Sequence, residues 1–335
     1  LLEAEELGEL AIDTETTSLD PHQAKLVGIS LSTKIGNAVY IPIGHKKGEN
    51  LKEKDVLKKI KPILEDKSIK KIGQNIKFDY IIFYHRGIDI NPMEDTMLMS
   101  YVLDAGKNRH NMDTLSVLHL GHKPIAFKEL VGSGKKEINF SEVNIMDAKD
   151  YAAEDADITF RLYKIFLKNL NSEKLTNIYE IFEKPLIKIL AMMEINGVKL
   201  DTSSLKKLSV KFEEKIKLLE SEIFKLSKKE FNIASTKQLG EIIYNELKIS
   251  AQKKTKKGSF ATSASVLEDL AFKGHKFPKL VLDWRQLTKL KNTYSDSLPE
   301  YINPETNRIH TSFLLAATTT GRLASSDPNL QNIPI

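Results

Sequence analysis

The chain has 335 residues, of which 41% are apolar and 28% are charged, and its formal net charge is +5. This length and composition predict a globular protein with two domains that each bury a core. No apolar run reaches the roughly 18 residues of a membrane-spanning helix, and the acidic start of the chain does not fit a signal peptide. We therefore expect a cytoplasmic protein with no membrane partner. Cysteine is absent, so any bound metal must have oxygen or imidazole ligands.

The first half of the chain predicts an α/β fold, a mixed sheet flanked by helices. Three strands, close enough in sequence for an antiparallel meander, are expected at residues 10–13, 26–31 and 38–43. A helix follows at residues 56–64 and a fourth strand at 71–73. Further helices are expected at 80–83, 95–103, 112–120 and 146–170. We place the first domain at residues 1–171 and the second at 172–335.

The second domain is predicted to be mainly helical. A helix over 176–195 should end at Gly197, and Ser235 can cap a helix over 236–247. Between them, residues 205–228 form a long amphipathic helix whose apolar positions step by three and four. Because this stripe lasts only about three heptads, it favours an intramolecular helix pair over a dimeric coiled coil.

Three short acidic stretches recur along the chain, at residues 13–15, 75–79 and 151–155. Asp13 and Glu15 alternate along an extended segment, so both side chains point to one face and Thr14 points away. Hydrolysis of a phosphodiester by two metal ions requires several carboxylates in one place. The first stretch can supply two of them.

The other two stretches can complete such a site. Tyr151 and Asp155 are four residues apart on a predicted helix and share one face, whereas Glu154 and Asp157 fall on other faces and are expected to be bystanders. Asp79 begins or precedes a helix that follows a strand, where residues commonly enter sites. Taken singly, these carboxylates could also belong to a turn, a helix cap or a solvated helix surface. Together they predict a phosphodiester-cleaving metal site.

These stretches resemble the motifs of the proofreading exonuclease superfamily, which has four acidic residues and a tyrosine. The wider segments are similar to the ribonuclease H-like 3′→5′ exonuclease domain of bacterial family A DNA polymerases of the polymerase I type, at residues 73–80, 109–113 and 151–157. The resemblance implies that Asp13, Glu15 and Asp155 hold one divalent ion. Asp13 and Asp79 would bind a second, with Mg²⁺ expected and Mn²⁺ or Zn²⁺ as alternatives. Tyr151 would orient the attacking water.

The same resemblance implies contacts to a single-stranded 3′ end of DNA. Leu19 would wedge against the terminal base, and Gln74, Asn75 and Arg109 would hold the frayed strand. A terminal nucleotide must be unpaired to enter such a cleft, so mispaired ends should be cleaved preferentially.

Several segments of the second domain resemble the thumb and the start of the palm of family A DNA polymerases, at residues 231–239, 254–258, 290–294, 309–313 and 319–334. By resemblance, Arg322 and Gln331 contact the primer terminus and the template beside it. The amides of Asn329, Gln331 and Asn332 can donate to minor-groove acceptors that all correct base pairs share. Further contacts of the thumb with the template–primer duplex are expected at Lys254, Lys256, Lys257 and Asn292, with a solvated loop as the alternative for the lysines.

The resemblance also implies the setting of the protein. We expect a monomer in the bacterial cytoplasm, associated with the nucleoid, and a fragment of a DNA polymerase used in replication and repair. Because no palm carboxylates follow residue 335, nucleotide addition by this chain is not expected. A stand-alone ribonuclease D-like exonuclease and a catalytically inactive DNA-binding remnant remain as alternatives. The complete acid set argues against the remnant, and the Thr320-Gly321-Arg322 segment argues against the ribonuclease D-like enzyme.

Overall fold

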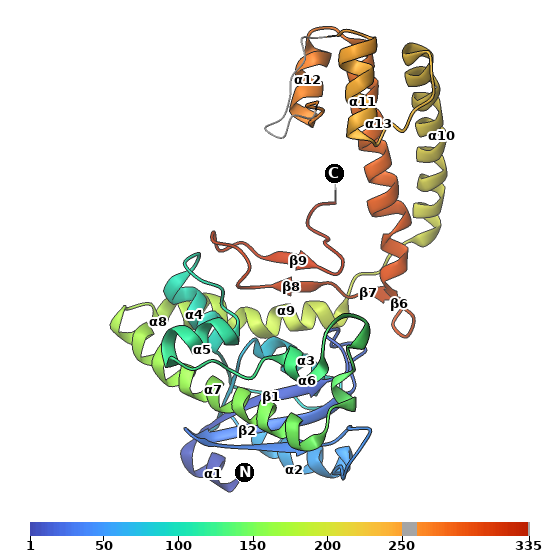
Figure 1. The fold of residues 1–335 in the computed structure, drawn as a ribbon. Helices are drawn as coiled ribbons and strands as arrows, with labels where there is room; N and C mark the ends of the chain where they lie inside the picture. Colours follow the sequence, from blue (N-terminus) through green and yellow to red (C-terminus); the bar gives the residue numbers. More distant parts are fainter. Residues whose placement is uncertain (250–259, 334–335) are drawn as a thin grey trace. The chain divides into compact units, whose positions relative to one another are not determined.

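The computed structural model describes residues 1–249 and 260–333, so the predicted DNA contacts Lys254, Lys256 and Lys257 lie outside the described residues. Its backbone packing divides the chain into two compact units (Figure 1). One unit comprises Leu1–Gly197 with His310–Gln331, and the other comprises Val198–Ile309 with the end of the chain from Asn332. The first unit thus extends past residue 171, where the sequence analysis places the domain boundary.

A five-stranded mixed sheet forms the centre of the first unit, as the sequence predicts, in the order β3-β2-β1-β4-β5. The strands β1, β2 and β3 form the expected antiparallel meander, whereas β4 lies parallel to β1 and β5 lies parallel to β4. Their bounds are Glu9–Thr16 (β1), Leu26–Lys34 (β2), Asn37–Pro42 (β3), Lys70–Gly73 (β4) and Met93–Asp95 (β5).

Helices cover this sheet, and two of them carry site residues. The long helix α7 packs along β1, β2 and β3, and α3 packs against β1, β4 and β5. Their contact with the sheet buries a continuous apolar core that includes Leu10, Ile72, Phe83 and Phe166. The helices of this part are Leu2–Leu7 (α1), Glu53–Glu65 (α2), Ile76–Tyr84 (α3), Thr96–Asp104 (α4), Met112–Leu120 (α5), Phe127–Val131 (α6) and Ile145–Ser172 (α7).

A helical segment after α7 extends the first unit. It consists of α8 (Thr176–Ile178), a π-helical turn and α9 (Lys184–Asn196), and it ends at Gly197 as predicted. Helix α9 packs on α3 and contacts β8 (Ser312–Leu314), which pairs with β9 (Ala324–Ser326). Leu315 after β8 is 4% exposed and belongs to the core of the sheet. This burial is why the hairpin belongs to the first unit.

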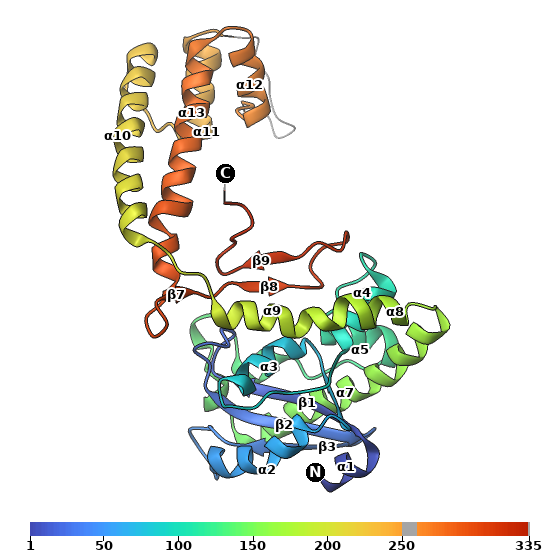
Figure 2. The same ribbon diagram turned by 180° about the vertical axis from the view of Figure 1, so that it is seen from behind.

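The second unit is mainly helical, as expected (Figure 2). Helix α10 packs along α13, which confirms an intramolecular helix pair, and Trp284 Nε1 donates to Glu220 Oε1 across it at 2.9 Å. Ser235 caps α11 as predicted. The elements are Thr202–Ser227 (α10), Thr236–Glu241 (α11), Ala264–Phe272 (α12), Lys276–Leu290 (α13), Ile302–Asn303 (β6) and Arg308–Ile309 (β7), with π-helical turns at Ile242–Glu246 and Lys291–Asp296.

Among the helices of the described residues, none combines the length and the apolar composition needed to cross a bilayer.

Candidate metal centre and nucleic-acid contacts

Three carboxylates from two elements converge at the end of β1. Asp13 and Glu15 on β1 and Asp155 on α7 each offer an oxygen, and these oxygens all lie within 4.8 Å of one another. Glu15 and Asp155 are buried, and Glu15 Oε1 has no hydrogen-bond partner among the described residues. A buried carboxylate oxygen without a partner is costly, so the arrangement is suited to a cation. Oxygen ligands of this kind favour hard divalent ions.

The electrostatics of this cluster show the same need for positive charge. Burial raises the pKa of Asp13 to about 7. Burial also raises the pKa of Glu15 well above its usual range, and the charges of Asp13, Asp155 and Asp79 raise it further. The pKa of Asp155 is raised by burial and then by Asp13. Negative charges this close together disfavour ionisation of each carboxyl group, and a bound cation would favour the ionised carboxylates instead.

The fourth acid, Asp79, lies on α3 and is held from the strand. Thr14 donates its backbone N–H and its hydroxyl to Asp79 Oδ1, at 2.9 and 2.5 Å. Asp79 is 2% exposed, and burial and the charge of Asp13 raise its pKa, against the opposing effect of Thr14. The alternation of the strand indeed turns Thr14 away from the face of Asp13 and Glu15. The sequence analysis gave Thr14 no role, although its side chain contacts one of the four acids.

Asp95, a buried carboxylate outside the acidic cluster, fixes the start of α3. Asp95 accepts hydrogen bonds from the backbone N–H groups of Asn75 and Ile76, both at 3.1 Å, and it caps α4. These bonds tie the beginning of α3 to the end of β5, and Asp79 lies one turn further along α3. Asn75, not Asp79, is the N-cap residue of this helix, with a left-handed φ of 62°. The helix-cap alternative for Asp79 is therefore wrong.

Tyr151 and Asp155 share one face of α7, as their spacing predicts, and both side chains line the same cleft. Burial and then the neighbouring carboxylates raise the pKa of Tyr151, so its phenol stays protonated. Phe127 and Phe140 pack around Tyr151, with ring centroids 6.0 and 6.1 Å from it. With Asp13, Glu15 and Asp155 they line a cleft of about 510 Å³. Leu19 also lines this cleft and is 95% exposed.

The two acids expected to be bystanders have partners outside the cluster. Glu154 pairs with His122 Nε2 at 2.7 Å. Asp157 pairs with Arg161 at 2.6 Å and accepts from the Gly36 N–H at 2.6 Å. Both side chains thus bond to groups outside the three converging carboxylates, and the charge of Glu154 reaches the cluster only as one of the effects that raise the pKa of Asp155.

The predicted strand contacts divide into two groups. Exposed Asn75 and Arg109 line a second hollow of about 520 Å³, together with residues 312–317. The amide of Gln74 is instead used inside the protein, where it donates to the His110 carbonyl and accepts from the Thr96 hydroxyl, at 2.7 and 2.5 Å. Gln74 thereby supports the loop that carries Arg109. Asn75 and Arg109 remain predicted contacts.

The predicted duplex contacts near the end of the chain are exposed, and some have internal partners. Arg322 is exposed and ends the loop after β8. Gln331 Nε2 donates to the Leu323 carbonyl at 2.8 Å, and Asn329 Oδ1 accepts from the Gln331 N–H at 3.0 Å. In the second unit, the Asn332 carbonyl accepts from the Tyr294 hydroxyl. The side chain of Gln331 therefore supports the backbone beside Arg322.

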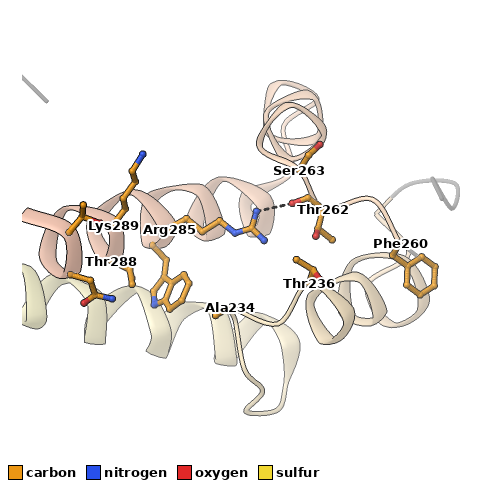
Figure 3. A pocket seen from close by; sticks show the side chains of 11 residues that line it. Ala234, Thr236, Phe260, Thr262, Ser263, Arg285, Thr288 and Lys289 are labelled. Carbon is orange, nitrogen blue, oxygen red and sulfur yellow. Dashed lines mark hydrogen bonds between the residues drawn. The ribbon is translucent and has the colours of Figure 1, made fainter. Parts of the chain in front are cut away.

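A pocket of about 710 Å³ lies in the second unit, with Arg285, Thr288 and Lys289 along one side (Figure 3). Asn292 also belongs to its lining. Arg285 crosses it to donate to the Thr262 carbonyl at 2.7 Å, and Thr288 Oγ1 is buried without a partner among the described residues. Lys289 adds a positive charge to its lining. The sequence analysis missed these residues. Thr288 and Lys289 follow Arg285 by three and four residues on α13, and this spacing indicates that the three side chains share one helix face.

Comparison with known proteins agrees with the fold of both predicted regions. The model of the 3'-5' exonuclease family matches residues 1–171, which is half of the chain, and the model of DNA polymerase family A matches residues 202–335. The chain therefore belongs to the 3'-5' exonuclease family, joined to a family A polymerase region.

More narrowly, its relatives are bacterial DNA polymerase I proteins. DNA polymerase I of Rhizobium leguminosarum is 47% identical over 100% of this chain and 35% of its own length, and that of Pseudomonas aeruginosa is 43% identical over 100% and 38%. The chain thus spans somewhat more than a third of these relatives. The solved POL domain of Pol1 from M. smegmatis, in complex with DNA primer-template and dNTP, has a TM-score of 0.81 at 26% identity. That match covers 98% of this chain and 53% of the solved chain.

Proposed function

We propose that the first unit removes nucleotides from the 3′ end of DNA by metal-dependent hydrolysis. The observation that carries this proposal is the convergence of Asp13, Glu15 and Asp155, with a buried Glu15 oxygen that lacks a partner among the described residues. Membership in the 3'-5' exonuclease family supports the direction of cleavage.

Magnesium is the ion that we propose for this site. The donors are all carboxylate oxygens, and the raised pKa values of Asp13 and Glu15 reflect negative charge that a divalent ion would offset. Asp13, Glu15 and Asp155 would hold one ion, and Asp13 with Asp79 a second. Such a pair supplies an activated water and stabilises the leaving oxygen when bound.

The protein's own groups position the substrate. The protonated phenol of Tyr151 can orient a water molecule or a phosphate oxygen, because its pKa keeps the proton in place at neutral pH. The aromatic wall of Phe127 and Phe140 offers a surface for the terminal base. Exposed Leu19 at the cleft is suited to separating that base from its neighbour. Asn75 and Arg109 would bind the strand behind it.

We further propose that the chain binds template–primer DNA, through Arg322 and Asn329 in the first unit and through the second unit. In the second unit, Asn292 and Lys289 line a pocket, and their side chains can donate to phosphate oxygens. Exposed Asn332 would contribute a minor-groove donor. Because phosphate contacts release counterions, this affinity should fall steeply with salt.

A 5′-labelled primer with a mispaired 3′ nucleotide tests the first proposal. With Mg²⁺, the wild-type chain should shorten it one nucleotide at a time, and faster than a fully paired primer. The Asp13→Ala/Glu15→Ala double variant should not shorten it but should still bind the duplex. Asp150→Ala is the matched control, because Asp150 is an exposed acid of the same helix that carries Asp155. Shortening by the double variant, or in the presence of EDTA, would contradict the proposal.

A further inference from the structure

The hydroxyl of Tyr101, on α4, makes two hydrogen bonds to a distant loop. It donates to the Thr318 carbonyl at 2.7 Å and accepts from the Gly321 N–H at 3.1 Å. Tyr101 is 5% exposed, so this hydroxyl satisfies two backbone groups of residues 318–322 at a buried position. The loop ends at Arg322.

The rest of the loop is also fixed through its backbone. The Thr318 hydroxyl donates to the Arg322 carbonyl at 2.7 Å, and Gly321 has a φ of +78°. At the other side, a Cβ added to Gly106 would lie 2.9 Å from Thr319 Cγ2, so the chain after α4 closely approaches the loop. These contacts hold the backbone while the side chain of Arg322 remains exposed.

We propose that Tyr101 is a positioning residue for Arg322. By holding Thr318 and Gly321, it orients the loop so that the Arg322 guanidinium faces the minor groove of bound duplex. This inference rests on the proposed duplex contact of Arg322, and it assigns a part in duplex binding to a residue within the region that matches the exonuclease family. Tyr101 lines neither the cleft of the acids nor the hollow of Arg109.

A double-mutant cycle tests the proposal. The variants are Tyr101→Phe, Arg322→Ala and their combination, and the readouts are primer–template affinity by fluorescence anisotropy and the rate of Mg²⁺-dependent single-strand cleavage. Phenylalanine keeps the ring that packs edge-on against His110. We expect Tyr101→Phe to weaken duplex binding about three- to tenfold, as for a lost buried hydrogen bond, with the single-strand kcat unchanged. In the Arg322→Ala background, Tyr101→Phe should add nothing.

Tyr84→Phe is the matched control and should bind duplex like the wild type. Tyr84 lies on α3, is 37% exposed, and packs its ring beside Tyr80. The inference would be overturned if the affinity losses of the two single variants add in the double variant, or if Tyr101→Phe binds duplex like the wild type. It would also be overturned if Tyr101→Phe lowers single-strand cleavage as much as duplex affinity. Failure of the proposed function looks different, because the wild-type chain itself would then not bind duplex or not cleave.

Discussion

Thr14 donates both its backbone N–H and its hydroxyl to one oxygen of Asp79, at 2.9 and 2.5 Å. Thr14 lies on strand β1 and Asp79 on helix α3, and the two residues are 65 positions apart in the sequence. The bonds hold Oδ1 of Asp79, and the charge of Asp13 acts on the same carboxylate by raising its pKa. Thr14 therefore sets the orientation of the fourth carboxylate of the proposed metal site.

Replacing Thr14 by valine should weaken exonuclease activity without unfolding the protein. Valine keeps the shape but removes the hydroxyl donor, and a hydrogen bond to a charged group contributes about 1.5–3 kcal/mol. We expect a rate about tenfold lower and a higher Mg²⁺ concentration for half-maximal rate. Thr14→Ser, which keeps the hydroxyl, should behave nearly like the wild type. An unaltered Mg²⁺ titration in Thr14→Val would show that Asp79 needs no such support.

Replacing Tyr151 by phenylalanine should lower the cleavage rate by about 10²-fold or more, because groups that assist proton transfer or orient water typically contribute this much. The measurement is single-turnover cleavage of a single-stranded oligonucleotide. Since the pKa of Tyr151 is raised, the wild-type rate should show no loss from phenol ionisation near pH 10. A descending limb there that disappears in Tyr151→Phe would mean that the phenol titrates, against this account.

The acidic cluster should make the stability of the metal-free protein depend on pH. The pKa of Asp13 rises from 3.8 to about 7 on folding, so the folded state retains a proton that the unfolded state releases. The contribution of Asp13 to stability should therefore fall as pH rises from about 4 to 7, and the raised pKa values of Glu15, Asp79 and Asp155 act in the same direction. In EDTA we expect a lower Tm at pH 8 than at pH 5, with Mg²⁺ restoring more at pH 8.

Asp13→Asn provides the control for that pH dependence. The amide carries no charge at any pH in this range, so the variant should have a higher Tm than the wild type in EDTA at pH 8 and a smaller response to Mg²⁺. If the variant is less stable under those conditions, the cluster is not under electrostatic strain.

The core of the second unit should matter for stability and duplex binding but not for single-strand cleavage. Ile223 on α10 is 0% exposed, and its truncation to alanine should cost about 2–4 kcal/mol. Leu218 on the same helix is 68% exposed, so Leu218→Ala should leave thermal unfolding unchanged. Calorimetry measures the stability of both variants, and a single-strand cleavage assay measures their exonuclease rate. If Ile223→Ala lowers single-strand cleavage as much as it lowers duplex binding, the two units do not have independent roles.

Local patterns in the sequence predict many of the helices and strands well. The long helix over 205–228 and the strand pairing of the meander follow from apolar periodicity and short connections, which act within a few residues. Strand β5 was missed because three residues carry too little pattern. The placement of β8 and β9 in the first unit was missed because it depends on the burial of Leu315 against elements far away in the sequence.

The same limit applies to the site. The acids were predicted from their spacing and resemblance, and Asp13, Glu15 and Asp155 do converge. Alternation predicted that the side chain of Thr14 points away from Asp13 and Glu15, but not that its hydroxyl bonds Asp79 on α3. Gln74 and Gln331 stay predicted DNA contacts, and the sequence did not predict that each amide also donates to a backbone carbonyl that only the folded chain brings near.

The most direct test of the metal centre is the release of label from a 3′-end-labelled single-stranded oligonucleotide by the wild type and by Glu15→Gln. Glutamine keeps the size of the side chain but removes the negative charge of the Glu15 carboxylate, whose Oε1 has no hydrogen-bond partner among the described residues. With Mg²⁺, the wild type should release labelled nucleoside 5′-monophosphate, and Glu15→Gln should do so at least about a hundredfold more slowly. Release by Glu15→Gln at the wild-type rate, or of label in longer fragments, would contradict a 3′→5′ exonuclease site at these carboxylates.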